Sequence, residues 1–263
     1  MNPNITPTHL LWTGGWDSTF RLLQLLIDYR KPVIPYYIID TSRASTLTEI
    51  DTRHSIVRKI IERYPYTEEL ILAGQYFSLG DIKKNEDVSS KFKILKSEMH
   101  IGSQYDWLSR FAVQFEINNL ELSIEKSDRT THFKDTSIFK LMEDKSAGSI
   151  YKVDEQLPDS HPKSIFKPFL YPLLDFYKTD MKRHSIDKGY DDILNTSWFC
   201  FTPINGRPCG LCNPCRNVVV EGLGHRLPKD ALFRNKYSSA YDSYAKMEKT
   251  AKRQIRKVFP DFQ

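Results

Sequence analysis

The sequence predicts an α/β protein with a doubly wound, parallel five-stranded sheet, followed by a four-cysteine knuckle and a helical tail. Short apolar runs bounded by glycine, proline and polar clusters alternate with longer segments in which apolar residues recur at helical spacing. This alternation of strands and helices is typical of parallel sheets. All four cysteines fall within residues 200–215, after the last alternation. We therefore expect an α/β domain over residues 1–195 and a knuckle with a helical tail over residues 196–263.

The predicted elements follow one another along the chain. Strands are expected in the apolar runs at residues 9–13, 33–40, 68–74, 120–125 and 165–174. Helices are expected at residues 17–28, 46–64, 105–118 and 178–189, the last ending at Gly189. Residues 77–99 are polar and rich in lysine with little periodicity, so they predict a surface insertion.

Length and charge limit the function. A chain of 263 residues can bury a sizeable core, and its net charge of +5, from 38 basic and 33 acidic residues, favours a small anionic ligand. No apolar run reaches the roughly 18 residues of a membrane span, and the first residues lack the segments of a secretory signal. Few, clustered cysteines argue for a reducing compartment. We expect a cytoplasmic protein.

The stretch TGGWDST, residues 13–19, follows the first predicted strand, at the position where such sheets bind ligands. Its two glycines allow a tight turn with exposed N–H groups, and the next helix directs its positive end at an anion. Thr13, Ser18 and Thr19 add hydroxyl groups, and Asp17 suggests either bound magnesium or a loop-bracing role. The Walker and dinucleotide patterns G-x-x-x-x-G-K-[ST] and G-x-G-x-x-G are absent. A plain strand-to-helix turn remains the alternative.

The cysteines have the spacing C-x8-C-x2-C-x2-C, at Cys200, Cys209, Cys212 and Cys215. Four thiolates can surround a tetrahedral zinc ion at about 2.3 Å each and leave no coordination position open, so the zinc would be structural. An iron–sulfur cluster and a set of unliganded core cysteines are the alternatives.

The TGGWDST stretch resembles the S-G-G-x-D-S loop of the PP-loop ATP pyrophosphatases, with Thr13 in place of the first serine. Together with the cysteines and the stretch PLLDFYKTDM, residues 172–181, it resembles the 7-cyano-7-deazaguanine synthase family of queuosine biosynthesis. The resemblance implies a Rossmann-like fold of the adenine nucleotide alpha hydrolase type, a homodimer, and binding of ATP, magnesium and zinc. It also implies that the four cysteines bind the zinc and that Asp17, Ser18 and Lys178 act in catalysis. The ATP-binding residues that it implies are Thr13, Gly14, Gly15, Trp16, Asp17, Ser18, Thr19 and Asp40.

The implied activity is that of an ATP-dependent carbon–nitrogen ligase. In the family, the carboxylate of 7-carboxy-7-deazaguanine is adenylated with release of pyrophosphate, converted to an amide, activated again and dehydrated to a nitrile. The resemblance therefore implies a deazapurine carboxylate as the small-molecule substrate, with AMP and pyrophosphate as products.

The segments that would recognise the substrate depart from the family pattern. The stretch IIDTSRASTLTEI keeps only Asp40, and IGSQYDWL keeps only Gly102 of a Pro-Gly-Arg-Asn hallmark. The stretch HFKDTS replaces a Gly-Tyr-Pro-Asp-Cys-Arg segment, where Phe133 could stack on a purine and Asp135 could accept from a guanine-like N–H edge. Gly102, Phe133 and Asp135 are thus the candidate substrate residues.

These departures leave other functions open. An activated acid can be attacked by any positioned amine, so one alternative is an enzyme that conjugates the deazapurine to a partner protein in a bacterial defence or modification system. A second alternative is an adenylating enzyme that modifies tRNA. A third is a non-catalytic zinc protein with a vestigial nucleotide loop.

Overall fold

The computed structural model describes residues 6–127, 130, 138–144 and 146–238 of the chain. The chain divides into two compact units, the first ending at Trp198 and the second beginning at Phe199. The predicted helical tail beyond residue 238 lies outside the described residues. Among the described helices, none has both the length and the apolar character that a membrane crossing requires.

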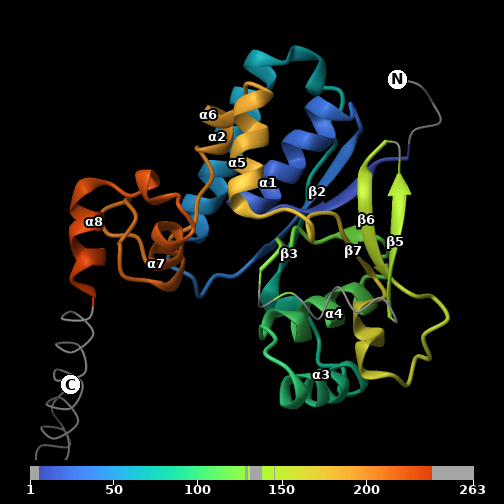
Figure 1. Ribbon diagram of the computed structural model, residues 1–263. Coiled ribbons are helices and arrows are strands. Elements are labelled where there is room, and N and C mark those ends of the chain that lie inside the picture. Colours follow the sequence, from blue (N-terminus) through green and yellow to red (C-terminus); the bar gives the residue numbers. More distant parts are fainter. Residues whose placement is uncertain (1–5, 128–129, 131–137, 145, 239–263) are drawn as a thin grey trace, which may run out of the picture. The chain divides into compact units, whose positions relative to one another are not determined.

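The first unit is built on a mostly parallel sheet of seven strands in the order β3-β2-β1-β4-β7-β6-β5 (Figure 1). The strands are β1 (Thr8–Leu11), β2 (Val33–Ile39), β3 (Gln75–Ser78), β4 (Leu120–Glu121), β5 (Phe139–Asp144), β6 (Gly148–Val153) and β7 (Phe169–Tyr171). The strands β3, β2, β1, β4 and β7 are parallel, whereas β5 and β6 form an antiparallel hairpin that continues the sheet beyond β7.

The prediction of a five-stranded sheet is therefore wrong, because it missed the β5–β6 hairpin. The edge strand β5, FKLMED, buries only its first residue, Phe139, and exposes most of the others. A strand with so little buried surface has no alternation of apolar and polar residues, which is the pattern that identifies half-buried strands.

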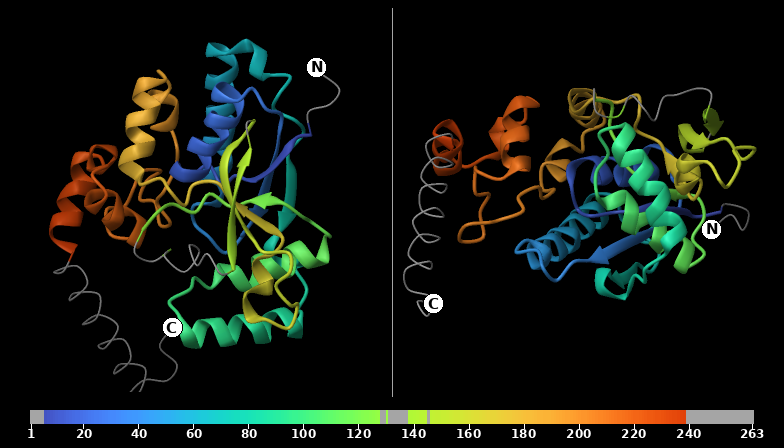
Figure 2. Two further views of the ribbon diagram at one scale, coloured as in Figure 1. Left: turned by 45° about the vertical axis from the view of Figure 1, so that its right-hand side comes forward. Right: turned by 90° about the horizontal axis from the view of Figure 1, so that it is seen from below.

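Helices form two groups around the sheet, one drawn above it and one below it in Figure 1, and Figure 2 shows the same separation. The first group packs α1 (Trp16–Leu23), α2 (Thr46–Arg63), α5 (Lys178–Asp187) and α6 (Asp191–Leu194) together, and α1 continues as the π-helical segment Gln24–Asp28. The second group contains α3 (Glu86–Glu98), α4 (Gln104–Gln114) and the 3-10 segment Pro162–Phe166. Further 3-10 turns lie at Pro65–Thr67 and Leu79–Asp81.

The prediction of a surface insertion at residues 77–99 is wrong, because most of this segment forms helix α3, which packs against the rest of the first unit. Asn85 caps the helix by accepting a hydrogen bond from the Val88 N–H at 3.1 Å. Val88, Phe92 and Leu95 are buried and follow helical spacing. These few apolar residues stand among many lysines, so the periodic signal is weak in the sequence, although their burial holds the helix in place.

Two predicted strands also differ from the structure in position. The expected strand at residues 68–74 touches β2 only around Ile71, and the chain pairs with β2 again as β3, Gln75–Ser78. Of the expected strand at residues 165–174, only β7 pairs with β4. Pro168 and Pro172 flank β7 and have no N–H to donate to a ladder, which confines the strand to the residues between them.

A buried ion pair joins α1 to the centre of the sheet. Arg21 donates from Nε and Nη2 to the two carboxylate oxygens of Glu121 at 2.7 and 2.8 Å, and both side chains are at most 2% exposed. Its Nη1 also donates to the carbonyl of Ala147, in the turn of the β5–β6 hairpin, at 2.9 Å. The pair thus connects three segments that are distant in sequence.

Replacing Arg21 by Met should lower the free energy of unfolding by about 3–5 kcal/mol, because Glu121 would remain as a buried, unpaired charge. Chemical denaturation of the variant measures this. The matched control is Arg63→Met, which removes an exposed pair with Asp192 and should cost about 1 kcal/mol or less. Equal effects of the two substitutions would contradict the assignment of a structural role to the buried pair.

Candidate functional site

The loop after β1 turns sharply at Gly14 into helix α1. Gly14 has φ +76°, a left-handed conformation that side chains disfavour, and its carbonyl accepts from the Trp198 N–H at 2.8 Å. A Cβ atom at Gly14 would lie 2.9 Å from Cγ of Arg53. Gly15 precedes the first turn of α1 and supplies no side-chain cap. The positive end of α1 is thus not capped by the side chain of its own N-cap residue, which favours anion binding there.

The hydroxyl groups of the loop brace it from within. Ser18 Oγ accepts from the Thr13 N–H at 3.3 Å and lies 3.3 Å from Thr13 Oγ1. Thr13 Oγ1 in turn accepts from the Gly15 N–H at 3.3 Å. Thr19 is fully buried, and its Oγ1 accepts from the indole Nε1 of Trp12 at 3.1 Å. The predicted loop residues are therefore held together, and Thr19 acts as part of the core.

A charged cluster lies beside this loop. Lys178 Nζ is 3.2 Å from Glu125 Oε1 and 4.0 Å from Asp17 Oδ2, and all three side chains are partly buried. The structure thus brings the predicted residues Asp17 and Lys178 together. Glu125 is a residue that the sequence reasoning missed, although its position at the end of the predicted strand 120–125 could have indicated it, because the carboxyl ends of neighbouring parallel strands meet at one edge of the sheet.

Arg53 of α2 is a second residue that the sequence analysis missed. Its side chain packs beneath the loop, next to Gly14. Its guanidinium carbon lies 4.7 Å from the ring centre of Trp12, 4.5 Å from that of Tyr37 and 5.0 Å from that of Tyr76. The side chain is 2% exposed, and this burial lowers the pKa of Arg53. No motif in the sequence signals Arg53, because its role comes from rings on three different segments.

The remaining predicted residues lie in different places. Asp40 follows β2, where its Oδ1 accepts from the N–H and Oγ of Ser42 at 3.0 and 2.6 Å, so its carboxylate braces the turn before α2. Gly102 precedes α4, and its carbonyl accepts from the Tyr105 N–H at 3.2 Å. Trp16 begins α1 and is buried. Phe133 and Asp135 lie outside the described residues.

The second unit contains the cysteine cluster, with α7 (Asn213–Val220), a 3-10 turn at Gly224–Arg226 and α8 (Lys229–Lys236). The four Sγ atoms lie within 4.8 Å of one another, so the cluster could hold a metal ion. Backbone N–H groups donate to the sulfurs: Cys209 to Cys200 Sγ at 3.2 Å, and Leu211 and Cys212 to Cys209 Sγ at 3.3 Å each. Such donors stabilise thiolates, which are the form that binds metals.

The thiols interact strongly among themselves. Hydrogen bonding with Cys200 and Cys215 lowers the pKa of Cys212, whereas hydrogen bonding with Cys212 raises the pKa of Cys200 to about 12. One thiolate is thus favoured over several, because negative charges close together repel one another. A bound cation would reverse this balance and release the remaining protons.

Helix α8 supports the cluster from outside. Arg234 Nε donates to the carbonyl of Cys209 at 2.7 Å, and Asn235 Nδ2 donates to the carbonyl of Gly210 at 3.0 Å. Gly210 has φ +79°, and a Cβ atom there would collide with the carbonyl of Ala231. These contacts fix the loop that carries Cys209 and Cys212.

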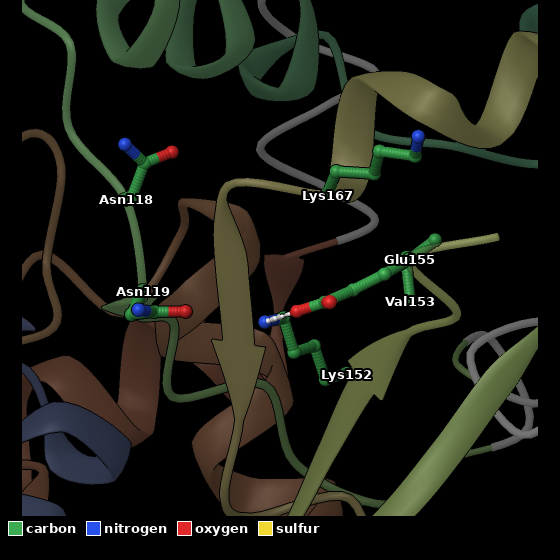
Figure 3. A pocket seen from close by; sticks show the side chains of 6 residues that line it. All are labelled: Asn118, Asn119, Lys152, Val153, Glu155 and Lys167. Atoms are coloured by element: carbon green, nitrogen blue, oxygen red, sulfur yellow. Dashed lines mark hydrogen bonds and ion pairs between the residues drawn. The ribbon is translucent and has the colours of Figure 1, made fainter. Parts of the chain in front are cut away.

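The first unit also has a surface pocket (Figure 3). It lies at the amino ends of β4 and β7, whereas the loop at residues 13–19 follows the carboxyl end of β1. Its lining comes from the residues before β4 and β7 and from the end of β6. The lysines that line it are paired, Lys152 with Glu155 at 2.6 Å and Lys167 with Asp159 at 2.7 Å. None of the residues that line this pocket belongs to a motif identified in the sequence, so it is a weaker candidate than the loop at residues 13–19.

In comparisons with known proteins, no protein-family model and no curated protein sequence matches the chain.

Proposed function

We propose that the protein is an ATP-dependent carbon–nitrogen ligase that adenylates the carboxylate of a 7-carboxy-7-deazaguanine-like substrate and releases AMP and pyrophosphate, before an amide or nitrile is formed. One observation carries the proposal. The TGGWDST loop follows the central strand β1 and leads into an α1 terminus without a side-chain cap, with Lys178 and Asp17 beside it. This arrangement supports binding of the phosphates of a nucleotide and stabilisation of the negative charge that develops on the departing pyrophosphate.

Each group of the site has a separate role in the proposed reaction. The backbone N–H groups at the start of α1 bind the departing pyrophosphate, and the ammonium of Lys178 offsets its negative charge. Asp17 would hold the magnesium that accompanies ATP, which supplies further charge neutralisation. Thr13 and Ser18 keep the loop in shape through their mutual hydrogen bonds. The substrate carboxylate attacks the α-phosphate, and the bond to the β-phosphate breaks.

We further propose that the cysteine cluster binds one structural zinc ion and that the protein acts as a homodimer. The zinc is supported by four sulfurs within 4.8 Å, which would complete a tetrahedral site without an open position for substrate. The homodimer and the identity of the deazapurine acid rest on the resemblance to the synthase family.

A second candidate differs in the group that receives the activated acid. The sequence HFKDTS stands where the synthase family has its base-binding segment, and only Asp40 and Gly102 remain of the other two hallmarks. A rebuilt acceptor site with a retained activation loop favours transfer to the amine of a partner protein, with release of AMP.

The proposed function is tested by incubating the protein with ATP, magnesium and 7-carboxy-7-deazaguanine, with and without ammonium, and measuring AMP and pyrophosphate. We expect release that depends on the acid, and a loss of about a hundredfold or more in Asp17→Asn, because the carboxylate that would hold magnesium beside the reacting phosphates is removed. The control is Asp51→Asn on the exposed face of α2, which should leave turnover unchanged.

Mass spectrometry of the product separates the two candidates. A nitrile or amide of the deazapurine supports the synthase-like reaction. When a candidate partner protein is added to the incubation, a deazapurine mass on that protein supports conjugation. If the acid does not stimulate pyrophosphate release under either condition, adenylation of a deazapurine acid is excluded.

A further inference from the structure

Lys178 occupies an electrostatically unfavourable position, because it is the first residue of α5. The N-terminus of a helix carries a partial positive charge and disfavours a cation in its first turn. Asp180, in the first turn of α5, supplies a negative charge at this helix end and accepts a hydrogen bond from the Tyr177 N–H at 3.0 Å. The ammonium of Lys178, in a side chain only 17% exposed, is instead compensated by carboxylates from other segments, of which Glu125 at 3.2 Å is closer than Asp17 at 4.0 Å.

The backbone places Glu125 beside Lys178. Strands β4 and β7 pair in parallel, and the Leu122 N–H continues the pairing by donating to the carbonyl of Leu170 at 2.8 Å. Farther on, the Lys126 N–H donates to the carbonyl of Phe176 at 2.9 Å. The segment that carries Glu125 is thus fastened at both ends to the segment that leads into α5.

A side-chain contact adds to this attachment. The Lys126 ammonium lies 4.7 Å from the ring centre of Tyr177, the residue before Lys178. The backbone on both sides of Glu125 is therefore fixed to the segment that leads into α5, which keeps the Glu125 side chain close to Lys178.

We infer that Glu125 is a positioning residue, which holds the ammonium of Lys178 toward Asp17 and the loop at residues 13–19; its part in turnover rests on the proposed function. A lysine ammonium has three N–H donors, so it can keep one on Glu125 while another reaches an anion. Without the carboxylate, the flexible four-carbon side chain samples other rotamers, and fewer molecules have the charge in place.

The first test measures pyrophosphate release in Glu125→Gln, Lys178→Met and the double variant. We expect Glu125→Gln to lower kcat about tenfold with less than about a threefold change in KM for ATP, because the charge is retained but misplaced. In the Lys178→Met background the same change should have no further effect. The control is Glu68→Gln, an exposed glutamate that should leave both constants unchanged. Additive losses in the double variant would overturn the inference.

The second test requires no turnover. The protein is treated with an acetylating reagent in the absence of ATP, and the modification of Lys178 is followed by mass spectrometry after digestion. We expect labelling of Lys178 to be several-fold faster in Glu125→Gln than in the wild type or Glu68→Gln, with thermal unfolding unchanged. Equal rates would overturn the inference even if the enzyme is active, whereas faster labelling in a protein that releases no pyrophosphate would retain the Glu125–Lys178 pair and reject only the proposed function.

Discussion

Removal of metal is expected to unfold the second unit while the first unit stays folded. A structural four-cysteine zinc site contributes about 10–16 kcal/mol of binding free energy, which serves as folding free energy in a small unit. We expect about one zinc per chain by elemental analysis, and loss of that zinc in Cys212→Ser. Limited proteolysis should then cut within residues 199–238 of this variant and of the chelator-treated wild type, and leave the first unit intact.

The matched control for this experiment is Asn213→Ser, at the exposed residue next to Cys212, which should keep its metal and its resistance to protease. Two outcomes would contradict the prediction. Iron and sulfide in place of zinc would identify an iron–sulfur cluster, and protease resistance without metal would show that the cysteines are ordinary core residues.

Replacing Gly14 by Ala is expected to abolish nucleotide-dependent turnover. The change introduces a Cβ atom at φ +76°, 2.9 Å from Cγ of Arg53, so the loop backbone must shift. A displacement of about 1 Å in a positioning group can reduce the rate about a hundredfold, and we expect at least this loss in pyrophosphate release.

The chain offers a close control for the backbone strain. Gly189 has φ +75° and no atom within 4 Å of a Cβ atom built there, so Gly189→Ala carries a similar conformational cost without a collision. Gly189→Ala should lose about 1–2 kcal/mol of stability by chemical denaturation and keep its turnover, whereas Gly14→Ala should lose at least as much stability and also lose turnover. Full activity in Gly14→Ala would show that the loop does not bind the phosphates.

The sequence predictions are accurate for features formed by residues close together in the chain, and poor for features formed by distant segments. The loop after β1 could be recognised because its glycines, hydroxyls and acid are adjacent in sequence, and the cysteine cluster because its spacing is local. Strand β2 could be recognised because its residues, VIPYYII, form an uninterrupted run without charged side chains. These features depend on residues within one turn or one strand.

Contacts between distant segments could not be predicted in this way, even though the end of a predicted strand marks Glu125 as a residue at the edge of the sheet. Glu125 meets Lys178 only because β4 and β7 are neighbours in the sheet, and Arg53 meets Trp12, Tyr37 and Tyr76 only after three segments have packed. The edge strand β5 is stabilised by its pairing with β6 rather than by its own composition. A single sequence records such pairings only indirectly, since no local pattern encodes them.

The contact between Arg53 and Gly14 has a consequence for engineering. The same guanidinium lies against the rings of Trp12, which follows β1, Tyr37 of β2 and Tyr76 of β3, and Cγ of Arg53 lies where a side chain at Gly14 would be. Transplanting residues 13–19 alone into another α/β scaffold should therefore yield a loop without its support. A complete graft would carry Arg53 and its three aromatic neighbours as one module, and substitutions at Tyr76 should alter the conformation of the loop although the loop sequence is unchanged.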